Sequence, residues 1–299
     1  MSPRLQPWRD YSGRTSPLKL IVFVSLFLPA IWIAAGFASG SGAFAARPLM
    51  EAIHQCGLWT IRLLMVSLLV TPARQMLQWP RLVLVRRMIG VAAFAYISAH
   101  FLLYVTDQAF NLWKVASEIV LRIYLTIGFT ALTGLAALAV TSTDAMMRRM
   151  GRNWTRLHRI IYGIGVLAVI HYFMQSKLDE WEPTILAGMF GWLMLYRLAA
   201  LPFPKQRPLP LWVSAAVSLV AALGTALGEA LYIWFSVGFS PLRVLMLNVT
   251  LRAGVRPVWF VLAAGLALTA ASAGRALWKR RGGLGIGGAL RPARGRVSG

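Results

Sequence analysis

The segment NWTRLHRIIYGIGVLAVIHYF, residues 153–173, places two histidines in one long apolar stretch. Such a stretch is typical of a membrane-spanning helix, which needs about 20 apolar residues to cross roughly 30 Å of hydrocarbon. His158 and His171 would then stand about 20 Å apart along the helix axis, at about 1.5 Å per residue. Ionisable side chains are costly inside a bilayer and mark functional sites by default. The segment therefore predicts histidines at two depths, which cannot both bind one iron.

The rest of the chain is equally apolar. Of its 299 residues, 58% are hydrophobic and only 13% are charged, and the mean hydropathy is +0.63, values that do not suit a soluble domain. The first apolar stretch follows several basic residues, as in a signal peptide, but its length and the lack of a soluble domain behind it favour a retained anchor. We expect an all-α integral membrane protein with eight spanning helices, at residues 18–38, 57–77, 87–106, 122–141, 156–175, 183–201, 211–235 and 257–278.

The charge distribution indicates the orientation of these helices. The net charge of +22, from 31 basic and 9 acidic residues, would suggest nucleic-acid binding in a soluble protein. Most of the basic residues, however, fall in the connections that share one side of the membrane with the N-terminus, so we expect no nucleic-acid partner. Because basic connections stay inside, we predict an inner-membrane protein with both termini in the cytoplasm. Six acidic residues fall on the opposite side: Glu51, Asp107, Glu118, Asp179, Glu180 and Glu182.

Prolines divide the chain after the sixth helix, at positions 202, 204, 208 and 210. We predict a cytoplasmic segment at 1–17, a six-helix domain at 18–201, a Pro-rich linker at 202–210, two additional membrane helices at 211–278, and a basic cytoplasmic tail at 279–299 that contacts membrane lipid. Glu229 lies near the outer end of the seventh helix; we expect a solvated carboxylate there rather than part of a quinone or proton site. The single cysteine, Cys56, excludes an intramolecular disulfide and is expected to be a small buried side chain.

Two of the histidines are matched in depth. His100 follows Arg87 by 13 residues and His171 follows Arg156 by 15, and each arginine marks the cytoplasmic end of a helix that runs outward. Two imidazoles at one depth on different helices can hold a haem iron from both faces, which suits electron transfer. We therefore predict that His100 and His171 bind haem. The alternative is that these histidines only form hydrogen bonds between helices or lie at an interface.

The other two histidines are less informative. His158 has no second histidine at its depth, so a second haem would need another sixth ligand or none, and the sequence leaves this open. His54 precedes the second helix at the outer surface, where a solvated histidine needs no function.

Four segments closely resemble the MsrQ family, also called YedZ: GLWTIRLLMVSLLVTPAR at 57–74, RRMIGVAAFAYISAHFLLY at 86–104, RIYLTIGFTALTGLAALAVTS at 122–142, and residues 153–173. The resemblance implies a ferric-reductase-like membrane domain that binds haem b, with FMN as a further cofactor. It also implies electron transfer to a periplasmic molybdopterin enzyme that reduces methionine sulfoxide in proteins. By motif, His100, His158 and His171 correspond to haem-associated histidines, and Arg122 is a candidate partner for a haem propionate or an interfacial anchor. The last two helices depart from the family pattern.

We therefore interpret the chain as the electron-transfer subunit of an oxidoreductase. Electrons would enter from quinol or a cytoplasmic flavin reductase, cross through one or two haems, and leave at the outer face. One alternative is a ferric or oxygen reductase, although no fused flavin and nicotinamide domain is evident. Another is a haem-free transporter or assembly factor, for which we find no internal repeat.

Overall fold

The computed structural model describes residue 8 and residues 13–176, 180–204, 207–250 and 254–286, with side chains given up to residue 278. Asp179, Lys205 and the 287–299 part of the predicted tail lie outside the described residues. The described helices are α1 (Pro17–Ser25), α2 (Leu28–Ser39), α3 (Pro48–Met76), α4 (Val83–Asp107), α5 (Leu112–Leu121), α6 (Ile123–Val140), α7 (Asp144–Met150), α8 (Arg152–Leu157), α9 (Ile161–Ser176), α10 (Trp181–Ala199), α11 (Leu211–Val237), α12 (Pro241–Thr250) and α13 (Pro257–Ile286), with 3₁₀ turns at Gly42–Phe44, Pro80–Leu82 and His158–Ile160.

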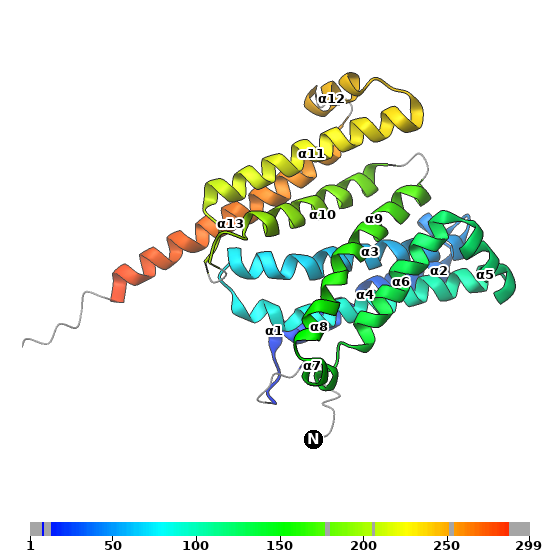
Figure 1. The fold of residues 1–299 in the computed structure, drawn as a ribbon, viewed down its shortest axis with the longest axis horizontal. Coiled ribbons are helices and arrows are strands. Elements are labelled where there is room, and N and C mark those ends of the chain that lie inside the picture. Colours follow the sequence, from blue (N-terminus) through cyan, green and yellow to red (C-terminus); the bar gives the residue numbers. More distant parts are fainter. Residues whose placement is uncertain (1–7, 9–12, 177–179, 205–206, 251–253, 287–299) are drawn as a thin grey trace, which may run out of the picture.

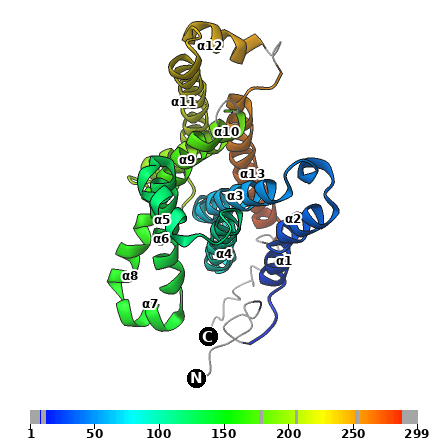
Figure 2. The same cartoon turned by 90° about the vertical axis from the view of Figure 1, so that its right-hand side faces the viewer.

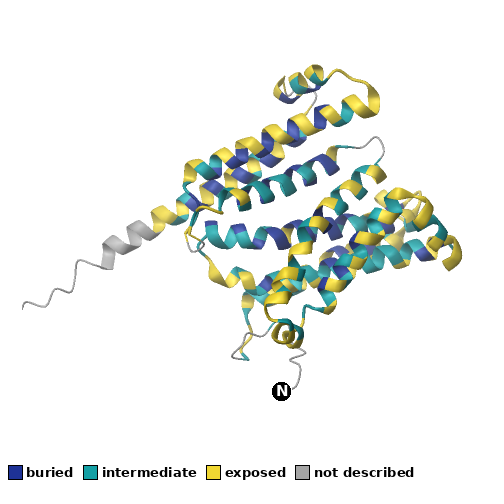
Figure 3. Cartoon of the chain, in the orientation of Figure 1, coloured by how far each residue is buried: buried dark blue, intermediate teal, exposed yellow. Residues whose placement is uncertain are grey.

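The long helices lie side by side, with α3 near the centre (Figure 1). Helix α3 packs against α4, α2 and α10, while α6 pairs with α9, and α10 packs against α11 and α13. Figure 2 shows the same arrangement nearly end-on, with α4 and α6 on one side of α3 and the C-terminal helices on another. Burial follows this plan, since the buried residues concentrate on α3, α10 and α11, whereas the outer faces are exposed and apolar (Figure 3).

The chain is a multi-pass membrane protein. In the described part of the chain, seven helical stretches are long and apolar enough to cross a bilayer: Pro17–Ser39, Pro48–Met76, Pro80–Asp107, Ile123–Val140, Arg152–Ser176, Leu211–Val237 and Pro257–Trp278. The remaining predicted span, 183–201, is helix α10. It is less apolar because it carries Glu182 and Arg197, which it directs to neighbouring helices rather than to lipid.

Several local features differ from the predicted spans. The first span is broken into α1 and α2 by the turn at residues 26–27, just before Pro29. The short helices α5, α7 and α12 were not predicted, because each is too short or too mixed in polarity to resemble a span. Helix α13 continues to Ile286 and so enters the predicted basic tail.

A proline inside α3 explains the position of one partly buried charge. Pro72 has no N–H to donate to the carbonyl of Leu68, four residues earlier. The guanidinium of Arg197 on α10 donates to that carbonyl at 2.5 Å and to the carbonyl of Leu193 at 2.7 Å, and it lies over the ring of Tyr162. The cation is thus held by carbonyl dipoles and ties α10 to α3.

The two C-terminal helices share the main core with the rest of the bundle. Val217 and Ala221 on α11 and Val261 on α13 belong to the same buried cluster as Leu186 and Trp192 on α10. The division of the chain into a six-helix domain and an additional pair therefore stays a prediction from the sequence, with no break in packing to mark it.

The expectation for Glu229 was wrong. Its side chain is 1% exposed, and its Oε1 accepts a hydrogen bond from the guanidinium of Arg256 at 2.5 Å. Asn248 on α12 is buried nearby, and α12 folds over this end of α11 and α13 (Figure 1). The partner arginine lies 27 residues away and α12 was not foreseen, so the shielding of the carboxylate could not be read from the seventh helix alone.

Candidate haem site

Helices α4 and α9 bring two predicted histidines together. The ring centroids of His100 on α4 and His171 on α9 lie 6.5 Å apart, and the ring planes are nearly perpendicular, at 88°. Each of these helices packs against both α3 and α6, which brings residues 71 positions apart in sequence to the same site.

Backbone carbonyls fix the protonation of both rings. His100 Nδ1 lies 2.7 Å from the carbonyl oxygen of Ile53, and His171 Nδ1 lies 2.8 Å from that of Tyr124. A carbonyl only accepts, so each Nδ1 must carry the proton and donate it. Each Nε2 then keeps a lone pair, and neither has a hydrogen-bond partner among the described residues. This is the arrangement by which proteins orient an imidazole for metal binding.

Two glycines make room for the imidazoles. A Cβ at Gly57 on α3 would lie 3.0 Å from His100 Nδ1, and one at Gly128 on α6 would lie 2.7 Å from His171 Cε1. Each ring therefore packs against backbone where a side chain is missing. The sequence shows these glycines inside apolar segments, but it does not show which ring each one faces.

The two rings line a cavity of about 650 Å³, within the usual range for small-molecule and cofactor sites. Its lining is mixed: part consists of apolar side chains and part of charged or hydroxyl-bearing ones. The apolar lining includes Ile97, Phe101, Leu125, Phe129 and Leu132, and the polar lining includes Arg47, Tyr104, Asp107, Lys114, Glu118, Arg122 and Tyr124. A cavity lined by apolar side chains and by three basic ones, Arg47, Lys114 and Arg122, suits a flat apolar molecule that carries carboxylates.

Arg122 lies at this polar part, as a propionate partner would. Its guanidinium donates to the hydroxyl of Tyr124 at 3.1 Å and pairs with Glu118 at 3.4 Å, while Tyr104 donates to the other Glu118 oxygen at 2.6 Å. Arg47 and Lys114 line the same cavity and were missed from the sequence. Both lie outside the apolar stretches, in segments that gave no sign of folding over the histidines.

The residues fit a metal held between two imidazoles. Two metal–nitrogen bonds of about 2 Å, together with the two ring radii, separate the ring centres by roughly 6 Å. The 6.5 Å between His100 and His171 is close to that distance. Among the described residues no group of three or more His, Cys, Asp or Glu is placed to hold a metal ion.

His158 lies elsewhere, against α8 and the end of α6. Its ring stacks on Trp154 with centroids 3.8 Å apart, and its Nδ1 lies 3.0 Å from the Trp154 carbonyl. Its Nε2 is 3.4 Å from the hydroxyl of Ser142, but that hydroxyl donates its proton to Leu138 at 2.6 Å. His158 Nε2 therefore has one long contact, whereas the Nε2 atoms of His100 and His171 have none among the described residues.

The residues around His158 are basic. Arg86 is near enough to interact electrostatically with its ring, and the neighbouring Arg87 pairs with Asp144 at the start of α7. The hydrogen bond from Arg87 holds the pKa of Asp144 below its usual range. The hydrogen bonds and ring stacking of His158 involve Trp154 and Ser142, and no histidine is among these partners in the described part of the chain.

The two remaining sequence predictions concern residues outside this site. His54 is half exposed, with its Nδ1 3.8 Å from Glu51, which agrees with a solvated interfacial histidine. Cys56 is buried as a free thiol, as expected for a small apolar side chain.

Comparison with known proteins agrees with the family resemblance of the sequence motifs. The family described as "Ferric reductase like transmembrane component" matches residues 56–169, which include His100 and His158 and end two residues before His171. A protein of Xanthomonas campestris pv. campestris strain 8004, named "Protein-methionine-sulfoxide reductase heme-binding subunit MsrQ", is 45% identical over 166 residues, 54% of this chain and 76% of its own length. A Rhodospirillum rubrum protein of the same name is 41% identical over 192 residues, 64% of this chain and 89% of its own length. No solved structure matches the chain.

Proposed function

This chain belongs to the MsrQ family, and from that membership we propose that it transfers electrons through haem b held by His100 and His171. A membrane electron-transfer role with haem agrees with the family and with the helical fold. The observation that carries the ligand assignment is the pair of rings 6.5 Å apart, each with its Nδ1 proton committed to a carbonyl. Haem held by these two imidazoles would supply a one-electron carrier.

The surrounding residues would hold and insulate the group. Arg47, Lys114 and Arg122 offer cations to its carboxylates, and Arg122 would exchange part of its contact with Glu118 for this role. Phe101 and Phe129, with centroids 5.8 Å apart, would exclude water from the apolar part of the cavity.

We propose that the acceptor is a periplasmic molybdopterin methionine-sulfoxide reductase, so that the pair would serve the repair of oxidised proteins. Support comes from the names of the relatives and from the position of the cavity near the predicted outer face. On this topology the chain lies in the bacterial inner membrane with both termini in the cytoplasm.

Electrons from the cytoplasmic side need a second carrier to reach the haem at His100 and His171, because about 20 Å of helix separates His171 from His158. We propose His158 as a ligand for a second haem in the cytoplasmic half, since the contact of its Nε2 with the Ser142 hydroxyl is a long one, at 3.4 Å. Electrons would reach it from quinol or from a cytoplasmic flavin reductase, with FMN as an additional cofactor.

The first test is the reduced-minus-oxidised spectrum with pyridine-haemochrome quantification. It compares the wild type with His100→Ala, His171→Ala and His158→Ala. We expect His100→Ala or His171→Ala to remove one haem b per chain, and His158→Ala to remove a second haem and spare the first. His54→Ala is the matched control, since its ring is solvated, and it should keep the full spectrum. Full haem content in both the His100 and His171 variants would overturn the ligand assignment.

The acceptor is tested separately from the haem. The dithionite-reduced protein, freed of excess reductant, is mixed with a methionine-sulfoxide reductase of the relatives' system and oxidised protein substrate, and reoxidation is followed optically. Fast reoxidation that requires both partner and substrate supports the proposed acceptor. Equally fast reoxidation by ferric citrate or oxygen alone would favour a ferric or oxygen reductase.

A further inference from the structure

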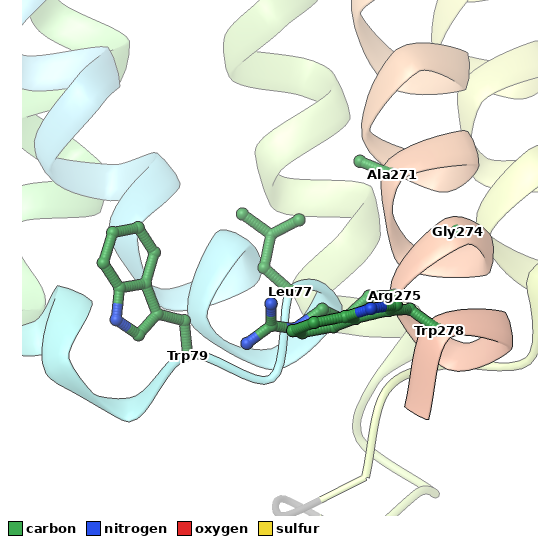
Figure 4. A pocket seen from close by; sticks show the side chains of 6 residues that line it. All are labelled: Leu77, Trp79, Ala271, Gly274, Arg275 and Trp278. Carbon is green, nitrogen blue, oxygen red and sulfur yellow. The ribbon is translucent and has the colours of Figure 1, made fainter. Parts of the chain in front are cut away.

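A second pocket lies where α13 crosses the C-terminal end of α3. Its volume is about 430 Å³, and it shares no lining residue with the cavity of His100 and His171. Figure 4 shows its lining, which comes from the turn after α3 and from one face of α13: Leu77, Trp79, Ala271, Gly274, Arg275 and Trp278.

Small residues on α13 leave one side of this pocket open. Its four lining positions follow a spacing of three, four and seven residues, which puts them on one face of the helix. Two of them, Ala271 and Gly274, are small, and a Cβ built at Gly274 would meet no atom within 4 Å. An apolar chain can therefore lie along this face without displacing protein.

Arg275 gives the pocket its charge. It is the one ionisable residue in the lining, its guanidinium lies 5.2 Å from the ring centroid of Trp278, and it extends from α13 toward Leu77 (Figure 4). Its Nε is buried and has no hydrogen-bond partner among the described residues. A guanidinium without a carboxylate partner is suited to an anionic oxygen, and phosphate is the group that it binds best in planar geometry.

The pocket's place in the membrane selects the source of that phosphate. It lies at the end of α3 that carries Arg74, and Arg81 follows nearby, so the local field is positive. Trp79 and Trp278 are 40% and 67% exposed and occupy the position of interfacial tryptophans. Basic pockets between helices on the cytoplasmic side are typical sites for anionic lipid headgroups.

We propose that this pocket binds one anionic phospholipid, with its phosphate on Arg275 and an acyl chain along Ala271 and Gly274. One wall belongs to the turn after α3 and the other to α13, so the lipid would bridge α13 to the turn that joins α3 and α4. The inference does not depend on which group the histidines hold.

Native mass spectrometry of the full chain tests this directly. The protein is released from micelles that contain equal amounts of dioleoyl-phosphatidylglycerol and dioleoyl-phosphatidylcholine, and the lipids retained per chain are counted. Two variants address the two parts of the site: Arg275→Gln removes the charge, and Gly274→Leu fills the space. Their matched controls are Arg243→Gln, which removes an exposed charge on α12, and Gly224→Leu, at an open position on α11.

We expect the wild type to retain one phosphatidylglycerol in preference to phosphatidylcholine. Arg275→Gln should lower that preference about fivefold, the effect of one basic residue near a lipid phosphate. Gly274→Leu should abolish retention, both controls should behave as the wild type, and excess inorganic phosphate should not displace the lipid. Equal retention of both lipids, an unchanged preference in Arg275→Gln, an equal loss in Arg243→Gln, or displacement by inorganic phosphate would each overturn the proposal.

Discussion

Replacement of Gly128 by alanine should remove haem held by His171 without any change of a ligand. The new Cβ would lie 2.7 Å from His171 Cε1 and 2.8 Å from Nδ1. Carbon atoms attract at about 3.5–4.0 Å, so the ring must retreat by about 0.8 Å or more. The ring cannot retreat freely, because its Nδ1 is held by the carbonyl of Tyr124 on the same helix as Gly128. A ligand displaced by about 1 Å no longer meets the productive geometry.

The assay is the haem-to-protein ratio by pyridine haemochrome, combined with the thermal unfolding midpoint in detergent. Alanine favours a helix over glycine by about 1 kcal/mol, so helix propensity alone predicts a more stable protein. Steric strain of about 1–3 kcal/mol should outweigh that gain.

Two other glycines provide a graded control. A Cβ at Gly57 meets His100 Nδ1 at 3.0 Å, a milder contact, whereas a Cβ at Gly163, on the same helix as His171, meets nothing within 4 Å. Haem loss should therefore fall in the order Gly128→Ala, Gly57→Ala, Gly163→Ala, with the last at wild-type content. Wild-type haem content and an unchanged spectrum in Gly128→Ala would refute the packing argument.

Two further predictions concern buried charges and are measured by thermal unfolding of the purified protein. Arg197→Met should lower the free energy of unfolding by about 1–3 kcal/mol, because the Leu68 carbonyl is left without a donor. The loss should be smaller in a Pro72→Ala background, where the introduced alanine would supply the missing backbone N–H. Equal losses in both backgrounds would argue against the role given to Pro72. Arg256→Met should lower the free energy of unfolding by about 3–5 kcal/mol, because the buried Glu229 carboxylate loses its partner. The double variant Arg256→Met, Glu229→Gln should be more stable than Arg256→Met alone. A double variant as unstable as the single one would contradict this.

The sequence predicts the features that depend on one segment at a time. The length of the apolar stretches predicts the membrane-spanning helices. Counting from Arg87 and Arg156 to the histidines predicts that both lie at one depth, and in the structure their ring centroids are 6.5 Å apart. It does not predict features that depend on how segments meet. The carbonyls that orient the rings, of Ile53 and Tyr124, belong to other helices, since each lies 47 residues from its histidine.

Long-range pairing also separates the charged residues of the bundle from the two histidines. Intramembrane charges are functional candidates because an unpaired charge in a bilayer is costly. In the structure, charged side chains avoid this cost by pairing with residues far away in the sequence. Glu182 pairs with Arg62, 120 residues away, and Arg197 donates to the carbonyl of Leu68, 129 residues away. The polar atoms of Glu182 and Arg197 therefore already have partners within the fold. His100 and His171 differ because the fold satisfies only one nitrogen of each ring and leaves the other beside a cavity. A free ring nitrogen beside a cavity, rather than polarity inside the membrane, is therefore the observation on which the proposed ligand site rests.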